Sequence, residues 1–230
     1  MAGLSPLPRA DQKATRVRAM FDAIAPRYEL LNHLLTFGMD AGWRRRTVAA
    51  LALPRGSLVY DLACGTGDLC RALEVAGYRV VGFDFSAGML AAARTGAQLV
   101  NADILDLPVP DGEADGATCG FALRNVVDLP RFFAELARVV RRGGRVGLLE
   151  VTEPEARLPR ALHHVYFHRM VPLVGGLLSD REAYRYLPAS TAYLPPPERL
   201  LQMLRDAGFP DAERRLLGLG AAQLIVGTRA

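Results

Sequence analysis

A glycine-rich turn between two carboxylates is the part of this sequence with the clearest capacity for chemistry. Asp61 stands near the end of an apolar stretch, Gly65 and Gly67 follow, and Asp68 begins a helical pattern. Glycines at a turn from strand to helix let the backbone bend tightly and approach a ligand closely. Two carboxylates would repel the pyrophosphate of a dinucleotide, which prefers positive potential at a helix N-terminus. They suit a ligand with an ammonium and a sulfonium, and S-adenosylmethionine has both.

Two further acidic positions stand where the next strands should end. Asp84 follows an apolar stretch, at about the place where an acid binds ribose hydroxyls. Asp103, with Ile104 beside it, closes the next stretch and can accept a hydrogen bond from an adenine amino group. Each has a plainer interpretation, because Asp84 could cap a helix, although Ser86 is better placed, and Asp103 could be a loop carboxylate. Nicotinamide sites also use a ribose-binding acid, so a dehydrogenase remains an alternative. Asp68 at the start of the helix disfavours it, because a carboxylate there would repel a pyrophosphate.

A parallel sheet would bring these residues together. Strand and helix patterns alternate from residue 58 to residue 150, which is typical of a parallel sheet with helices on both faces. The last two strand patterns follow each other without a helix, and they fit an antiparallel hairpin at one sheet edge. The expected strands are Leu58–Ala63, Arg79–Phe85, Ala97–Ala102, Gly116–Phe121, Arg145–Glu150, Ala212–Gly218 and Ala221–Thr228. The expected helices are Asp68–Ala76, Ser86–Arg94 and Pro130–Arg141, the last ended by Gly143 and Gly144.

Two stretches of the single expected domain, residues 1–230, do not follow the alternation. Apolar residues recur at three- and four-residue spacing through residues 14–53. This predicts an N-terminal cap of two helices, broken at Gly38, with the second over Trp43–Leu53. Residues 151–197 hold seven of the 15 prolines. An insertion of that length in an α/β fold is usually functional, so we expect a lid over the acceptor site.

Composition and charge exclude several classes of protein. The chain has 230 residues, 50% hydrophobic and 23% charged, which is the mixture of a folded globular domain. No apolar run approaches the roughly 20 residues of a spanning helix, and no secretory signal is visible. Three cysteines are too few for a disulfide framework, so we expect the cytoplasm. The net charge of +4 is mild, and we expect no nucleic-acid partner.

Motifs outside the glycine turn carry a family resemblance. Residues 120–126 read Gly-Phe-Ala-Leu-Arg-Asn-Val, and residues 184–190 read Tyr-Arg-Tyr-Leu-Pro-Ala-Ser. Because of these two motifs, the chain resembles the menaquinone/ubiquinone-biosynthesis C-methyltransferase family, which is a branch of the class I S-adenosylmethionine-dependent methyltransferases. The similarity extends over nearly the whole chain, including Met20–Ala25, Leu30–Asn32, Asp61–Leu69, Arg142–Arg145 and Leu149–Glu150.

The resemblance implies a fold, a cofactor and a class of acceptor. The fold would be a Rossmann-like, seven-stranded, mostly parallel sheet with an antiparallel last strand. The cofactor would be S-adenosylmethionine, without a metal. The acceptor would be a reduced polyprenyl quinol, demethylmenaquinol in our interpretation, with a methoxy-polyprenyl benzoquinol as the alternative. Gly120 departs from the family, since many relatives have a serine there. The family's cofactor contacts correspond to Thr66, Asp84, Asp103 and Ile104, and we add Gly65.

Methylation of a ring carbon requires an ionised quinol, and the sequence offers residues for that step. A quinol hydroxyl should have a pKa near 10, like tyrosine, and a nearby guanidinium would lower it. Arg124 is the candidate guanidinium, with Asn125 as a hydrogen-bond donor. Tyr28 or a water could relay the proton. The plainer interpretations are a surface ion pair between Arg124 and Asp128, and a Tyr28 that belongs to the helix core.

The long apolar tail of such an acceptor has a consequence for location. We expect a cytoplasmic protein that visits the inner face of the cell membrane as a peripheral protein. The arginines at 44–46 form a solvated helix face or touch lipid phosphates. Candidate lipid-facing residues, which could instead be core, are Leu34, Leu35, Phe37, Leu177 and Leu178.

Other functions and assemblies stay open at this point. The chain could methylate another small molecule, or it could be a catalytically silent subunit of a quinone-synthesis complex. A homo-oligomer is neither required nor excluded. His164 and His168 are one helical turn apart, but no adjacent carboxylate completes a zinc pattern, so we expect no metal.

Overall fold

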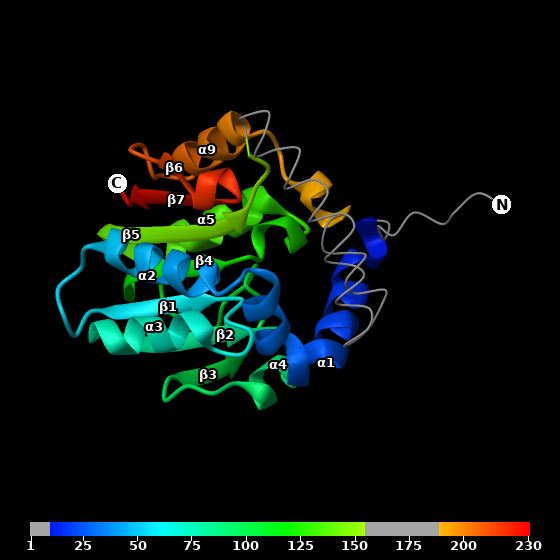
Figure 1. Ribbon diagram of the computed structural model, residues 1–230. Coiled ribbons are helices and arrows are strands. Elements are labelled where there is room, and N and C mark those ends of the chain that lie inside the picture. The colour runs from blue at the N-terminus through cyan, green and yellow to red at the C-terminus, as the bar shows by residue number, and fades with distance from the viewer. Residues whose placement is uncertain (1–9, 155–188) are drawn as a thin grey trace.

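The structure, a computed structural model, describes residues 10–154 and 189–230 (Figure 1). Within these ranges lies a seven-stranded sheet with the strand order β3-β2-β1-β4-β5-β7-β6. Strand β7 pairs antiparallel with both β5 and β6, and the other pairs are parallel, as the sequence predicts. The strands are β1 (Leu58–Leu62), β2 (Arg79–Asp84), β3 (Gln98–Asn101), β4 (Ala114–Gly120), β5 (Val140–Val151), β6 (Glu213–Leu217) and β7 (Ala222–Thr228).

Helices cover both faces of the sheet, which also agrees with the prediction (Figure 1). Apolar residues of α2 and α3 pack with β1 on one face, and those of α5 and α9 pack on the other. The α-helices are α1 (Ala10–Leu35), α2 (Met39–Leu51), α3 (Asp68–Ala76), α4 (Ala87–Ala92), α5 (Leu129–Val139) and α9 (Pro197–Asp206). Short 3-10 turns are η1 (Leu123–Asn125), η3 (Thr191–Tyr193) and η4 (Gly218–Gly220).

Strand β5 begins earlier than expected and contains the two glycines assigned to a helix end. Helix α5 stops at Val139, and Val140 already pairs with Ala114 of β4. The register then shifts, so that Arg145 pairs with Gly116. Residues 141–144 form the irregular part of the strand where the register shifts. Only glycine fits at position 144, because a Cβ there would stand 2.6 Å from the Val140 side chain.

The second N-terminal helix also begins earlier than predicted, at Met39 rather than Trp43. Gly38 has a φ of 72°, a left-handed conformation that glycine adopts without strain, and it separates α1 from α2. The early start adds the turn that holds Asp40, whose carboxylate accepts a hydrogen bond from Thr36 at 2.8 Å. Helix α2 packs on β5 and α3, so it belongs to the helical layer of the sheet.

Helix α1 lies beside the carboxyl ends of the parallel strands and is fastened there at two places (Figure 1). The Asp22 carboxylate accepts hydrogen bonds from the Ser86 hydroxyl at 2.5 Å and the Gly88 amide at 3.0 Å. The Lys13 ammonium donates to the Val126 carbonyl at 3.0 Å and lies 4.0 Å above the Tyr193 ring. Burial lowers the pKa of Lys13 to about 8. These contacts hold one side of α1 against the sheet edge where the site forms.

In the described part of the chain, no helix has the length and apolar character that crossing a membrane requires. The central part of the predicted lid, 155–188, lies outside the described residues, and the histidines and leucines proposed there lie outside them too.

Candidate functional site

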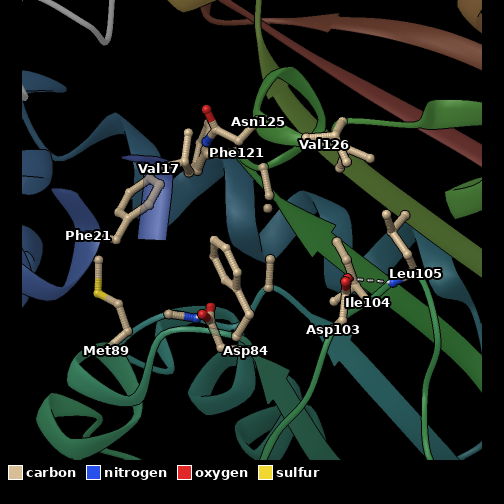
Figure 2. A pocket seen from close by; sticks show the side chains of 16 residues that line it. Val17, Phe21, Asp84, Met89, Asp103, Ile104, Leu105, Phe121, Asn125 and Val126 are labelled. Atoms are coloured by element: carbon tan, nitrogen blue, oxygen red, sulfur yellow. Dashed lines mark hydrogen bonds between the residues drawn. The ribbon is translucent and has the colours of Figure 1, made fainter. Parts of the chain in front are cut away.

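A mostly apolar cavity of about 110 Å³ lies at the carboxyl edge of the sheet (Figure 2). Side chains from α1, from the ends of β2 and β4 and from the loop after β3 surround it. Figure 2 shows Phe21 and Met89 on one side and Leu105 and Val126 on the other, with Asp84 and Asp103 at the polar end. The lining residues with apolar side chains include Val17, Phe21, Met89, Ile104, Leu105, Phe121, Val126 and Val127.

A smaller and more polar cavity of about 40 Å³ adjoins the first. Its wall contains Arg44, Asp61, Thr66 and Asp68. The two cavities are neighbours, because four residues line both of them: Ala63, Gly65, Gly120 and Phe121. An elongated ligand with a polar part and a less polar part would have a place for each part in these adjoining cavities.

Asp84 closes the glycine turn onto the sheet. One of its carboxylate oxygens accepts the Gly65 amide at 2.8 Å, and the other accepts the Ser86 amide at 2.8 Å. Burial raises the pKa of Asp84, and the backbone hydrogen bonds oppose that shift. Ser86 is the N-cap of α4, as predicted, and accepts the Met89 amide at 3.1 Å. Asp84 thus has lone pairs left to bind hydroxyl groups and also fixes the position of the loop.

All five residues proposed for cofactor binding line these two cavities. Asp84, Asp103 and Ile104 line the apolar cavity, Thr66 lines the polar one, and Gly65 lines both. The Asp103 carboxylate also accepts the Leu105 amide at 2.9 Å, which orients it at the rim (Figure 2). The geometry therefore fits one extended ligand with an adenosine-like part and an amino-acid part.

Asp61 is the buried carboxylate of the polar cavity. It accepts hydrogen bonds from Thr118 Oγ1 at 2.8 Å and Cys70 Sγ at 3.3 Å. Burial raises its pKa to about 7, although both hydrogen bonds and the nearby Arg44 charge lower it. The carboxyl is therefore poised between its neutral and ionised forms near neutral pH, and a cationic ligand would favour the ionised form.

Arg124, the candidate guanidinium for the acceptor, is held by protein groups next to the apolar cavity. Its Nη1 pairs with the Glu150 carboxylate and donates to the Phe121 carbonyl at 2.8 Å, and its Nε donates to Ser190 Oγ at 3.1 Å. It is 4% exposed and Glu150 is fully buried, and Arg124 is not one of the residues that line the cavity. The guanidinium therefore interacts with protein groups, because the Glu150 side chain reaches it from β5. No pattern in the sequence signals this pair.

The plainer alternative for Arg124, an ion pair with Asp128, does not occur among the described residues, where Arg124 pairs with Glu150. Asp128 is the N-cap of α5 and accepts the Arg131 amide at 3.0 Å. Asn125 does line the apolar cavity, as its proposed contact with the acceptor requires. Tyr28 belongs to α1, but its side chain lies outside the described residues.

Phe121 stands at the junction of the cavities with a strained backbone. Its φ of 60° is unusual for a bulky side chain. The Phe121 amide donates to the Leu149 carbonyl at 2.7 Å, and the Phe121 carbonyl accepts a hydrogen bond from the Arg124 guanidinium. Arg124 and β5 together hold this conformation, which turns the ring into the wall shared by the cavities.

Arg44 is a site residue that sequence reasoning missed. It was assigned to a solvated or lipid-facing triplet, and its neighbours Arg45 and Arg46 are exposed, but Arg44 is 8% exposed and lines the polar cavity. It pairs with Asp40 and with Asp68, the latter at 3.0 Å. The spacing of Asp40 and Arg44 by four residues on one helix was the available signal.

Among the residues that the structure describes, no group of three or more His, Cys, Asp or Glu could hold a metal ion. His163, His164 and His168 lie outside that part of the chain.

Known proteins resemble this chain over nearly its whole length. The model of the ubiE/COQ5 methyltransferase family matches residues 9–229. A demethylmenaquinone methyltransferase of Roseiflexus castenholzii is 44% identical over 97% of this chain and 97% of its own. Another of Thermus thermophilus is 44% identical over 91% of this chain and 100% of its own. A ubiquinone/menaquinone biosynthesis C-methyltransferase UbiE of Geobacter sulfurreducens is 38% identical over 96% of this chain and 91% of its own.

Solved structures share the fold at low sequence identity. A putative methyltransferase bound to the Haloferax volcanii Trm112 activator aligns with a TM-score of 0.67 and 20% identity, over 91% of this chain and 97% of its own. A methyltransferase of Thermotoga maritima, described as a possible histamine N-methyltransferase, aligns with a TM-score of 0.65 and 21% identity, over 92% of this chain and 99% of its own. These similarities show the fold alone.

The raised pKa of Asp61 predicts a pH dependence of S-adenosylmethionine binding. The carboxylate must be ionised to attract an ammonium, so affinity should fall as the pH drops through about 7 and approach a tenfold loss per pH unit below it. Isothermal titration calorimetry between pH 5.5 and 8.5 measures this dependence. Asp61→Asn should weaken binding at pH 8 and flatten the curve. Equal pH dependence in the variant and the parent would exclude Asp61 as its source.

Proposed function

The chain belongs to the ubiE/COQ5 methyltransferase family, and we propose that it methylates a ring carbon of a reduced polyprenyl quinol, with demethylmenaquinol as its preferred acceptor. It is an S-adenosylmethionine-dependent methyltransferase. The observation that carries the proposal is a polar cavity next to an apolar one, with four residues lining both. The polar cavity suits the donor's amino-acid part, and the end of the apolar cavity at Asp84 and Asp103 suits the donor's adenosine part. The apolar wall of the same cavity suits an aromatic ring with an isoprenoid tail.

The preference for demethylmenaquinol rests on the relatives. The two relatives that are 44% identical are named demethylmenaquinone methyltransferases, whereas the one that is 38% identical has a name covering both quinones. Val17 and Phe21 of α1, with Val126 and Val127 opposite, form an apolar wall that suits a fused naphthalene ring.

The site residues divide the work of the proposed reaction. When bound, S-adenosylmethionine supplies an electrophilic methyl group on its sulfonium. Asp84, Asp103 and Ile104 would hold the adenosine part, with Gly65 and Thr66 beside the amino-acid part. Asn125 lines the acceptor chamber and can hydrogen-bond a ring oxygen, which orients the ring carbon toward the methyl group.

Proton removal and positioning complete the proposed mechanism. The hydroxyl proton would be relayed to solvent through Tyr28 or a water, and the ring carbon would lose its own proton to solvent after it has bonded to the methyl group. Arg124 acts as a positioning residue, because its guanidinium fixes Phe121, Glu150 and Ser190 relative to one another.

The redox state of the acceptor gives a direct test of the function. An oxidised quinone has an electron-poor ring and no hydroxyl to ionise, so only the quinol should accept a methyl group. Purified protein should methylate demethylmenaquinol under anaerobic reducing conditions, and mass spectrometry should detect a product heavier by one methylene. The benzoquinol acceptor should react at least about tenfold more slowly. Methylation of the benzoquinol alone would overturn the preference, and methylation of neither quinol would overturn the function.

Variants of the Arg124–Glu150 pair test the positioning role. Removing one partner of a buried pair leaves an uncompensated charge and costs about 3–5 kcal/mol of stability. Arg124→Gln and Glu150→Gln should each lower kcat about a hundredfold, with little change in donor affinity. Because the two residues act as a unit, the double variant should be no worse than either single variant.

The pH–rate profile distinguishes positioning from direct activation of the quinol. Its midpoint should stay the same in both variants, because Glu150 and Arg124 do not touch the quinol in this account. A normal kcat in Glu150→Gln, together with an upward shift of the midpoint in Arg124→Gln, would assign Arg124 a direct role in stabilising the quinol anion.

Peripheral membrane binding is the corresponding proposal for location, at the inner face of the cell membrane. Phe37, in the turn between α1 and α2, is 74% exposed, and exposed Arg45 and Arg46 follow it on α2. An exposed apolar side chain followed by exposed cations on the next helix suits an anionic bilayer surface.

Vesicle flotation with anionic phospholipid tests this proposal. The parent should float with the vesicles, and Phe37→Ser should reduce the bound fraction severalfold because a phenyl ring no longer enters the bilayer. Val75→Ser is the matched control, because Val75 is 85% exposed but lies on α3. Equal losses in both variants, or no flotation of the parent, would contradict the proposal.

A further inference from the structure

We propose that Arg44 binds the carboxylate of the donor's methionine part and thereby makes α2 a component of the donor site. The inference rests on the proposed function, since it takes S-adenosylmethionine as the ligand. It concerns a residue outside the glycine turn, from a helix that the sequence assigned to a separate cap.

The polar cavity presents both charge signs that an amino acid requires. A methionine moiety carries one ammonium and one carboxylate. Asp61 and Asp68 line this cavity, and Arg44 is the one cationic side chain among the described residues of its wall. The carboxylates suit the ammonium, and the guanidinium is the complementary group for the ligand's carboxylate.

The N-terminus of α3 is a poor alternative site for that carboxylate. Helix N-termini attract anions through their free amide groups. Here Asp68 occupies the first turn of α3, and its own carboxylate lies in the cavity wall. A second carboxylate at this position would be repelled unless a cation separated the two, and Arg44 lies 3.0 Å from Asp68.

The orientation of Arg44 is set before any ligand binds. Its Nη1 pairs with Asp40, one helical turn earlier, and its Nη2 pairs with Asp68. Its guanidinium carbon lies 5.5 Å from the centroid of the Phe121 ring. A guanidinium has five N–H donors in a planar fork, so these two pairs leave donors for a third carboxylate. The ligand's zwitterion would thus extend the existing pair of Arg44 and Asp68.

Decarboxylated S-adenosylmethionine provides a direct test, because it keeps the ammonium and lacks only the carboxylate. Calorimetry should show that the parent binds S-adenosylmethionine about ten- to a hundredfold more tightly than the decarboxylated compound. In Arg44→Gln this preference should disappear or reverse, while affinity for the decarboxylated compound changes less than about threefold. Arg44→Lys should retain part of the preference, since it keeps the charge without the fork.

Arg71→Gln is the matched control. Arg71 also pairs with Asp68 and loses the same charge on substitution, but it does not line the polar cavity. It lies in the wall of the wider outer cavity that Arg44, Thr66 and Asp68 also reach. This variant should keep the parent's preference between the two ligands. Asp61→Asn should weaken both ligands by a similar factor, because both carry the ammonium.

The outcomes separate this proposal from the proposed function. Unchanged binding of 5′-methylthioadenosine, which lacks the amino-acid part, would show that Arg44→Gln is folded with an intact adenosine site. A parent-like preference in such an Arg44→Gln protein overturns the proposal and leaves the function standing, with the carboxylate held by backbone amides of the glycine turn. A parent that binds neither S-adenosylmethionine nor S-adenosylhomocysteine overturns the function itself.

Discussion

The parallel register of neighbouring strands is the constraint on which the site depends. Leu62 of β1 lies opposite Phe83 of β2 on one side and Cys119 of β4 on the other. The next residues along each strand therefore arrive at one edge of the sheet together. Asp84 holds two of these chain ends together, because its carboxylate accepts the Gly65 amide from the turn after β1 and the Ser86 amide from the turn after β2. Without that register the acidic groups would be scattered along the sheet.

Buried charges in the site are paired, and the pairs join elements that are distant in sequence. Arg124 and Glu150 connect the turn after β4 with the end of β5, and Ser190 connects the chain after residue 188 to the same guanidinium. Arg44 and Asp68 connect α2 with α3. A buried pair contributes little net stability, yet the loss of one partner is costly. These pairs therefore make the relative positions of the elements difficult to alter.

The two N-terminal helices serve different halves of the site. Val17 and Phe21 of α1 face the apolar chamber, while Arg44 of α2 lines the polar cavity. The strained Phe121 stands between these halves, where its ring forms a wall common to both. The helices before the sheet are thus structural parts of the site as well as a cover.

Much of the fold followed from the sequence alone, and so did the grouping of the candidate cofactor residues around two adjoining cavities. Hydrophobic periodicity and glycine placement are local signals, and they predicted seven strands, their topology class and the positions of Asp84, Asp103 and the glycine turn. The same signals misplaced the start of α2 and the boundary near Gly144, because a backbone bulge and a left-handed glycine depend on neighbouring strands and helices.

The tertiary structure alone decided the partners of the charged side chains. Arg124 was expected beside the acceptor and Arg44 in solvent, but Glu150 binds the first and Asp68 the second. Glu150 and Asp68 are each more than 20 residues away from their arginine in the sequence. The spacing along the chain signals a pair within one helix, such as Asp40 and Arg44, but it does not encode the distance and burial that decide a pair between two different elements.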